Sequence, residues 1–328
     1  MMRQYQNTDY IQLSAVLHAR EAHLLTHALS ERMLDAPTAA ESWKVLSACG
    51  YPSLECCTME RVECVLARER AALYRELAAM APDARVVALF QLKYDYHNAK
   101  LALKGKHLGA DVSHLAMDCG RYEPSALLRG KYSVLSAPLR RAVERAEKEA
   151  EHSGDLRAAE LLLDRACYEE LSEIADETGS AFLRDYAALQ IDAVNLRTLV
   201  RVSRMNGSDE LLRSALLRGG GIPVAALCSV RGSAIADLTG TTPLRAAGAL
   251  AVPLLEGGGS LTAFERACDD ALMEFLQRAR RTPFGVEVAA GYLGAKEAEL
   301  TAVRTIMAGK LAGLAPEDIR ARLRMNYL

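Results

Sequence analysis

The sequence predicts an all-α fold, and three observations support this prediction. The helix-forming residues Ala, Leu, Arg and Glu recur throughout the 328 residues. Apolar residues recur three and four positions apart over segments of about 10 to 25 residues, whereas the alternation typical of β-strands is rare. Gly, Pro, Asn and Ser gather between these segments, where they indicate turns.

The turn signals divide the chain into its expected helical segments. In order, they are Gly50-Tyr51-Pro52, Ala81-Pro82-Asp83, Ser153-Gly154-Asp155, Asn206-Gly207-Ser208, Gly219-Gly220-Gly221, Gly257-Gly258-Gly259 and Thr282-Pro283-Phe284-Gly285. Pro82, Pro283 and Pro316 suit the first turn of a helix, because a backbone N–H there has no intrahelical partner to lose. From Leu139 to Glu151, opposite charges four residues apart predict an exposed helix.

A short motif recurs at intervals of about 100 residues and predicts internal repetition. Asp164-Arg165-Ala166-Cys167 reappears 101 residues later as Glu265-Arg266-Ala267-Cys268. A weaker copy, Glu60-Arg61-Val62-Glu63, begins 104 residues earlier. A helical segment follows each copy, so the motif marks the same place in three successive units.

A second motif follows each copy of the first, with an acidic residue and then a basic residue five positions on. The acid and base are Asp95 and Lys100, then Asp192 and Arg197, then Glu299 and Arg304, with Asn98 and Asn195 at the fourth position of the first two copies. The apolar residues beside each acid share one helical phase. We therefore predict three similar helical-bundle repeats, at residues 1–110, 111–210 and 211–328, in the usual size range of a domain.

The acid and base of each copy cannot face each other, because five residues turn an ideal helix by about 140° beyond one full turn. Each therefore needs a partner on another helix or in water. In one interpretation Asp95, Asp192 and Glu299 pin neighbouring helices, while Asn98 and Asn195 satisfy buried backbone groups. In the other, these residues line a cavity that has a function.

Several functional classes are not expected. The 40 basic and 42 acidic side chains nearly cancel, and aromatic residues make up 5% of the chain, so a nucleic-acid partner is not indicated. No phosphate-binding loop, zinc-ligand spacing or hydrolase motif occurs in the sequence. The most apolar stretch, Ala246 to Leu255, contains Pro253 and is shorter than the roughly 20 residues of a membrane-spanning helix.

Two alternatives remain open on the residues alone. One is an all-helical enzyme that holds a divalent metal with Asp185, Asp192 and Glu299, because Asp185 and Asp192 are seven residues apart and share a helix face. The other is a general helical scaffold for a soluble partner.

Segments from nearly the whole chain resemble the C-subunit family of rotary V/A-type ATPases, whose eukaryotic counterpart is the d subunit. The matching segments are Tyr10, Ala19-Arg20, Leu24-Leu25, Met33-Leu34-Asp35-Ala36, Leu46, Gly50-Tyr51, Tyr94 to Lys104, Ile191 to Arg201, Pro283-Phe284-Gly285, Tyr292-Leu293, Glu299-Leu300, Val303-Arg304, Gly309-Lys310, Ile319, Leu323 and Tyr327.

The resemblance implies three helical domains in a pseudo-threefold, funnel-like arrangement. It implies a non-catalytic central-stalk adaptor, without nucleotide or other cofactor, that joins the central shaft to the membrane rotor ring on the cytoplasmic side. The complex would couple ATP hydrolysis or synthesis to proton or sodium transport. The recurring polar residues are then expected to contact the shaft: Asp95, Asn98, Lys100, Asp192, Asn195, Arg197, Glu299 and Arg304.

Overall fold

The computed structural model describes residues 4–328, and this part of the chain contains helices and no strand. The predicted all-α class is therefore confirmed. The α-helices are α1 (Ile11–Glu21), α2 (His27–Asp35), α3 (Ala39–Val45), α4 (Met59–Met80), α5 (Ala84–Leu108), α6 (Pro124–Leu128), α7 (Ala137–Ser153), α8 (Leu156–Glu177), α9 (Ala181–Arg204), α10 (Asp209–Ala215), α11 (Val224–Ser229), α12 (Ala234–Thr239), α13 (Arg245–Leu255), α14 (Leu261–Leu276), α15 (Val286–Leu311) and α16 (Pro316–Arg320). Short 3-10 helices are Asn7–Tyr10, Leu46–Cys49, Ser113–Leu115, Tyr132–Val134 and Gln277–Arg281.

Side-chain N-caps start most of the long helices, and two of them, Asp83 and Asp155, lie in predicted turns. Thr58, Asp83, Asp155, Ser180 and Ser260 each accept a hydrogen bond from a backbone N–H in the first turn of the helix that follows. Pro316 begins α16 as predicted. The same prediction is wrong for Pro82 and Pro283. Both lie outside the helices, before Asp83 and Gly285, which are the N-cap residues of α5 and α15.

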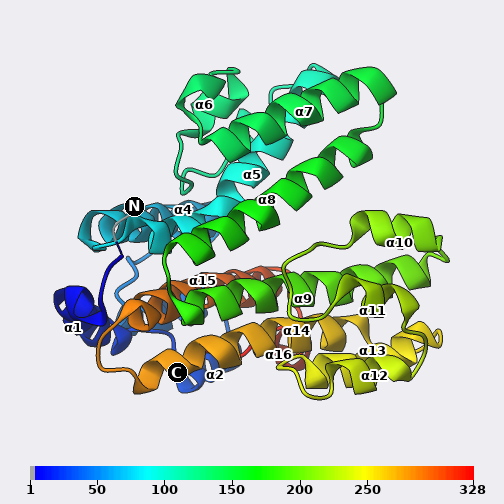
Figure 1. The fold of residues 1–328 in the computed structure, drawn as a ribbon. Coiled ribbons are helices and arrows are strands. Elements are labelled where there is room, and N and C mark those ends of the chain that lie inside the picture. The colour runs from blue at the N-terminus through cyan, green and yellow to red at the C-terminus, as the bar shows by residue number, and fades with distance from the viewer. Residues whose placement is uncertain (1–3) are drawn as a thin grey trace.

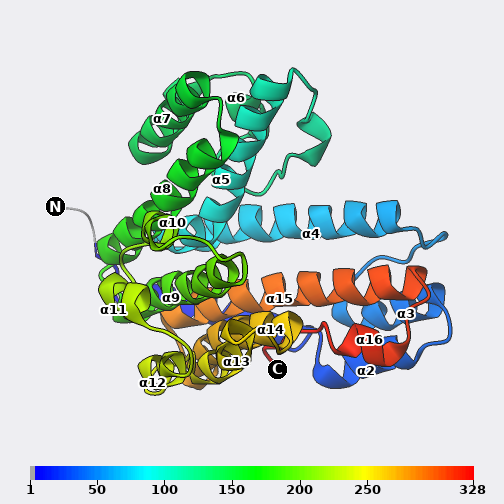
Figure 2. The same cartoon turned by 90° about the vertical axis from the view of Figure 1, so that its right-hand side faces the viewer.

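Three pairs of consecutive long helices form the frame of the molecule: α4 with α5, α8 with α9, and α14 with α15. The second helix of each pair packs against the first helix of the next pair, so that α5 contacts α8 and α9 contacts α14. The last of these helices, α15, packs back against α4. Figure 2 shows α5 beside α8 at the top and α15 beside α4 to the right. The three interfaces therefore close a circle.

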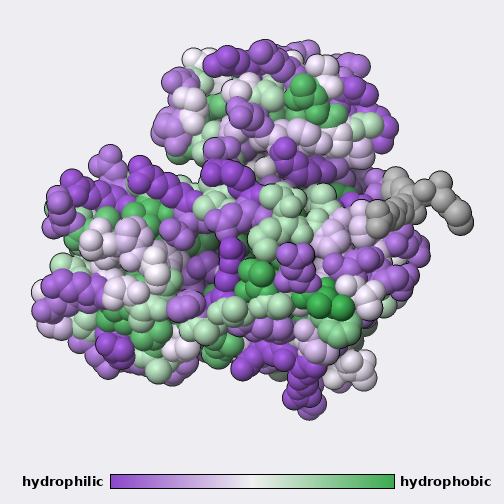
Figure 3. Space-filling view, turned by 90° about the vertical axis from the view of Figure 1, so that its left-hand side faces the viewer, coloured by the Kyte–Doolittle hydropathy of each residue, from purple (hydrophilic) through white to green (hydrophobic). Residues whose placement is uncertain are grey.

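One lobe stands apart from the rest of the fold. It consists of α6, α7 and the adjoining ends of α5 and α8, and it rises above the layer of α9, α14 and α15 (Figure 1). The exposed charged helix expected at 139–151 is α7, which packs against α8 through Leu139, Ala142, Val143, Ala146 and Ala150. On the face opposite that of Figure 2, apolar residues gather below this lobe among hydrophilic ones (Figure 3).

The apolar stripes expected beside the three acids are all buried. They are Leu92, Tyr96, Ala99 and Leu103 on α5, Leu189, Ala193, Leu196 and Val200 on α9, and Leu293, Leu300, Val303 and Met307 on α15. The first half of α15 joins the large core shared by most helices, and its second half joins a separate core with α2, α3 and α4. Within residues 4–328, no helix combines the length and the apolar character that a bilayer crossing requires.

Candidate partner-binding site

The first acid, Asp95, lies fully buried on α5 and holds the loop that precedes α6. Its Oδ1 accepts a hydrogen bond from the backbone N–H of Arg121 at 2.9 Å, and its Oδ2 accepts one from Arg121 Nε at 2.6 Å. One turn further along α5, Asn98 accepts from the N–H of Met117 and donates to its carbonyl, both at 2.9 Å. These two side chains therefore anchor both ends of the segment 117–121 to α5.

The second copy repeats this arrangement on α9. The carboxylate of Asp192 accepts hydrogen bonds from the N–H groups of Gly221 at 2.9 Å and Ile222 at 3.0 Å. Asn195 accepts from the N–H of Leu217 at 2.8 Å and donates to its carbonyl at 2.9 Å. Asp192 and Asn195 are thus equivalent to Asp95 and Asn98 in the backbone groups they bind as well as in sequence.

Glycine permits the close approach of the loop in both copies. A Cβ atom on Gly120 would overlap Oδ1 of Asp95, and a Cβ on Gly220 would overlap Oδ1 of Asp192. The sequence identified the Gly219 to Gly221 run only as a turn. The signal that could have identified the function of Gly220 is its position, 100 residues after Gly120.

The third acid, Glu299, is buried on α15 and binds the N-terminal part of the chain. Its Oε2 accepts a hydrogen bond from the backbone N–H of Leu25 at 2.7 Å, and its Oε1 accepts one from the hydroxyl of Tyr51 at 2.8 Å. Lys296, one turn earlier on α15, donates to the same carboxylate. The third copy therefore binds the segment before α2, as the first two bind the segments before α6 and α11.

The bases of the three motifs form ion pairs across the three helix interfaces. Lys100 on α5 pairs with Asp164 on α8, and Arg197 on α9 pairs with Asp269 on α14. Arg304 on α15 pairs with Glu63 on α4, with 2.5 Å between Nε and Oε1. Each base thus finds its partner on another helix, as the 140° rotation between acid and base requires.

Glu63, and not Glu60, is the structural equivalent of Asp164 and Glu265. These three residues are spaced 101 positions apart, and Arg197 Nε lies 3.8 Å from Oε2 of Glu265. The residues one position earlier, Val62, Leu163 and Phe264, are all fully buried. The expected register of the first copy was wrong by three residues, because the shared Glu-Arg dipeptide at 60–61 lies one turn before the pairing position.

Arg121 lies between two buried carboxylates at the first interface. It donates to Asp95 and, through Nη1, to Oε1 of Glu170 on α8 at 2.8 Å. Tyr96 and Ser136 also donate to Glu170, at 2.9 and 3.0 Å. Burial raises the pKa of Asp95 to about 6, although Arg121 acts in the opposite direction. The second copy has glycine in place of Arg121, and there burial raises the pKa of Asp192 while two backbone N–H groups oppose it.

Sequence reasoning missed Glu297, which connects α15 to both α4 and α5. Its carboxylate accepts hydrogen bonds from Tyr74 Oη at 2.7 Å, Tyr94 Oη at 2.5 Å and Lys93 Nζ at 2.9 Å. Burial alone would raise the pKa of Glu297, but Lys93 and the two hydroxyls hold it below its usual value. No sequence signal marked this residue, because one Glu in a charged stretch resembles an exposed position.

The three acids of the metal-enzyme alternative do not converge. Asp185 is exposed on α9, whereas Asp192 is buried and both of its oxygens accept backbone N–H groups. Glu299 lies on α15 and is bound by Leu25, Tyr51 and Lys296. In the described part of the chain, no three His, Cys, Asp or Glu side chains gather as metal ligands would.

Comparison with known proteins identifies the family. The model of the ATP synthase (C/AC39) subunit family matches residues 13–322. The chain is 24% identical over 325 residues to the C subunit of the V-type sodium ATPase of Enterococcus hirae, with 97% of this chain and 99% of that protein covered. It is 30% identical over 256 residues to the C subunit of the A-type ATP synthase of Haloferax volcanii, with 73% of each chain covered. It is 27% identical over 314 residues to the C subunit of the V-type ATP synthase of Thermus thermophilus, with 90% of this chain and 92% of that protein covered. The chain therefore belongs to the ATP synthase (C/AC39) subunit family, whose members are structural, non-catalytic parts of V/A-type ATPases.

Proposed function

We propose that this chain is the central-stalk adaptor of its rotary ATPase, joining the central shaft to the membrane rotor ring on the cytoplasmic side. In this function it passes torque between the two while ATP hydrolysis or synthesis is coupled to proton or sodium transport. Membership of the C/AC39 family places the chain in a V/A-type ATPase. The observation that supports a mechanical function is the closed circle of three helix interfaces.

The proposal includes three structural repeats with the boundaries expected from the sequence, 1–110, 111–210 and 211–328. Each range contains one complete pair of long helices: α4 with α5, α8 with α9, and α14 with α15. Each acid lies in one range and binds the backbone or a side chain of the next, and Glu299 in the third range binds the first. The bases connect the same ranges in the same order. This cyclic order supports a pseudo-threefold, funnel-like arrangement.

A closed circle of interfaces suits the transmission of torque. In an open row of repeats the two ends can separate by bending, whereas in a closed circle each interface must open together with its neighbours. Dense packing of helices resists such deformation. The ion pairs and backbone hydrogen bonds fix the register at every interface, so a load applied to one repeat is shared by all three.

The recurring polar residues then divide into two groups. Asp95, Asn98, Asp192, Asn195 and Glu299 are buried and hold the repeats together, so they act on the shaft only through the shape they maintain. Lys100, Arg197 and Arg304 are partly exposed at the interface edges, with side-chain exposures of 27%, 15% and 60%. We propose that these three bases contribute to the shaft-binding surface.

The test measures binding of the purified chain to the shaft subunits and, separately, to the isolated rotor ring of the same ATPase. The proposal expects both to bind. Replacing Arg197 and Arg304 together by Ala should weaken shaft binding and leave the helical circular dichroism unchanged. If the double variant binds the shaft with unchanged affinity, the two arginines stabilise the fold and do not contact the shaft. Failure of the unmodified chain to bind shaft or ring would contradict the adaptor function.

A further inference from the structure

A groove rich in arginine lies between α14, α15 and the segment that follows α16. Its volume is about 670 Å³, and its lining residues are Thr262, Arg304, Thr305, Ala308, Gly309, Ala312, Leu314, Ile319, Arg322 and Arg324. These include three arginines and two threonines but no acidic residue. Figure 2 shows α14, α15 and α16 near one another on the face turned to the viewer.

The arginines of the groove are only partly neutralised by the protein. Arg304 uses Nε to bind Glu63 at 2.5 Å, and Arg324 uses Nε to bind Asp269 at 2.6 Å. Asp269 is also the partner of Arg197, so one carboxylate is shared between two guanidinium groups. Arg322 is exposed, and its guanidinium makes no hydrogen bond or ion pair with any residue in 4–328. The groove therefore carries excess positive charge and unused N–H donors.

The floor of the groove leaves room for an incoming side chain. Ala308 in the last turn of α15 and Ala312, the C-cap residue of that helix, are both exposed and have short side chains. Thr262, the second residue of α14, also lines the groove and adds a hydroxyl group to it. Among the basic side chains, arginine is best suited to bind a carboxylate through two parallel hydrogen bonds, in a bidentate arrangement. The shape and the charge both favour a carboxylate.

We propose that this groove binds acidic side chains of the central shaft, with Arg322 as the principal contact and Arg304 and Arg324 beside it. This inference rests on the adaptor function proposed above and assigns the shaft contact to a place and a chemistry. Charge complementarity of this kind fixes orientation and accelerates association more than it adds affinity. Charge complementarity therefore suits an adaptor that must bind the shaft in a single orientation.

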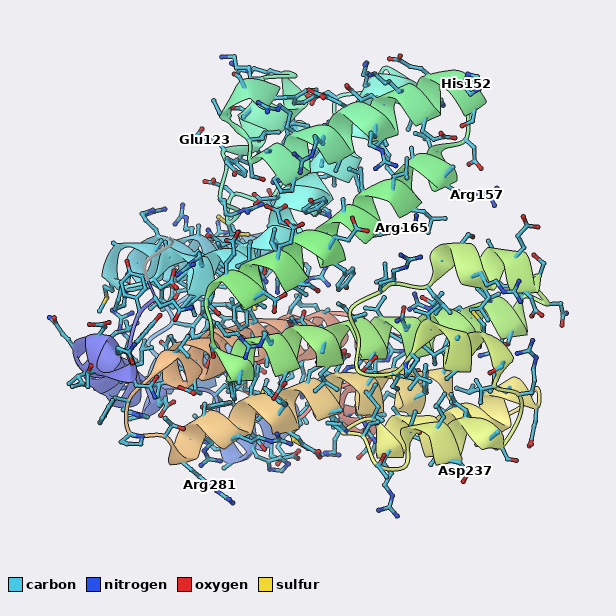
Figure 4. All side chains as sticks on the ribbon, viewed as in Figure 1. Glu123, His152, Arg157, Arg165, Asp237 and Arg281 are labelled. Carbon is cyan, nitrogen blue, oxygen red and sulfur yellow. The ribbon has the colours of Figure 1, made fainter. Side chains whose placement is uncertain are left out.

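The experiment compares two charge reversals, Arg322→Glu in the groove and Arg281→Glu as the matched control. Arg281, labelled in Figure 4, is exposed and lies in the 3-10 helix that follows the C-terminal end of α14, whereas the groove includes Thr262 at the N-terminal end of that helix. Neither guanidinium has a partner among the described residues, so both variants should keep the circular dichroism and the melting temperature of the unmodified chain. Shaft binding is measured for each at about 50 and about 200 mM NaCl.

The proposal expects Arg322→Glu to weaken shaft binding at least about tenfold at low salt and to reduce its salt dependence, because one attractive charge becomes repulsive. Arg281→Glu should stay within about twofold of the unmodified chain. Ring binding should be unaffected by either variant. A Lys in place of the contacting shaft carboxylate should restore the affinity of Arg322→Glu.

Three results would overturn the inference. If the unmodified chain binds the shaft and Arg322→Glu binds it equally well, the groove is not the contact, while the adaptor function stands. If the unmodified chain does not bind the shaft at all, the adaptor function and the groove assignment both fail. Binding of anionic lipid vesicles through Arg322, with shaft affinity unchanged, would reassign the groove to the membrane surface.

Discussion

The carboxylate of Glu299 on α15 accepts a hydrogen bond from the backbone N–H of Leu25, a residue 274 positions earlier in the chain. This contact corresponds to those of Asp95 with Arg121 and of Asp192 with Ile222, each of which joins one of the three proposed ranges to the next. Because it runs from the third range back to the first, it closes the circle. Its loss should affect the whole molecule rather than one end.

Glu299→Ala should lower the free energy of unfolding by about 3 kcal/mol, because it leaves a buried N–H, the hydroxyl of Tyr51 and the ammonium of Lys296 without their acceptor. The control is Glu274→Ala, an exposed position on α14 at which the change should stay within about 0.5 kcal/mol. Urea unfolding measures both. Equal effects of the two substitutions on the free energy of unfolding would show that the contact of Glu299 with Leu25 does not stabilise the fold.

Gly120→Ala and Gly220→Ala should each destabilise the protein by about 1–3 kcal/mol, because the added Cβ displaces the loop from its buried carboxylate. Gly258→Ala is the matched control, since the nearest atom to its Cβ would be 3.6 Å away. Thermal unfolding compares the three variants. Both loop variants should be less stable than the control, and similar melting temperatures for all three would contradict the close approach of loop and carboxylate.

Arg121→Ala should be far more destabilising than Arg304→Ala. Arg121 neutralises two buried carboxylates, so its removal should cost about 3–5 kcal/mol. Arg304 and Glu63 form an exposed pair, which contributes at most about 1 kcal/mol. A double-mutant cycle for Arg304 and Glu63 isolates the second value. A coupling energy as large as the effect at Arg121 would show that the exposed ion pairs, and not the buried groups, hold the interfaces.

The buried Asp95 predicts a specific dependence of stability on pH. Its pKa is raised to about 6 in the folded protein, so the folded state binds the proton more tightly than the unfolded state does. The stabilisation from this proton is present below about pH 4 and is lost as the pH rises through about 6. Relative to Asp95→Asn, which does not titrate, the unmodified chain should therefore lose up to about 3 kcal/mol between about pH 4 and about pH 7. A constant difference across this range would contradict the raised pKa.

The sequence alone predicted the helical class, most turns and the buried stripes, because these depend on local propensity and on the period of the apolar residues. It also located the three acids and the two Asn side chains. The interpretation in which they pin neighbouring segments agrees with the contacts of Asp95, Asn98, Asp192, Asn195 and Glu299. The prediction that they face the shaft is not established by these contacts.

The remaining features could not be predicted from the sequence because they depend on long-range packing. Glu297 is unremarkable in sequence, and only the convergence of α4, α5 and α15 brings Tyr74 and Tyr94 to it. The hydrogen bond from Leu25 to Glu299 could not be predicted either, because its donor is a backbone N–H, which every residue except proline has. The arginine groove combines residues from α14, α15 and the C-terminal segment. The period of apolar residues shows which face of one helix is buried, but it does not show which distant segments lie side by side.

The adaptor function is tested most directly by removing this chain from the assembled ATPase and measuring ATP hydrolysis and ion transport in the same membranes. The proposed function predicts that the catalytic head continues to hydrolyse ATP while transport driven by ATP stops, and that adding the purified chain restores transport. Transport that continues without the chain, or hydrolysis by the chain on its own, would contradict it.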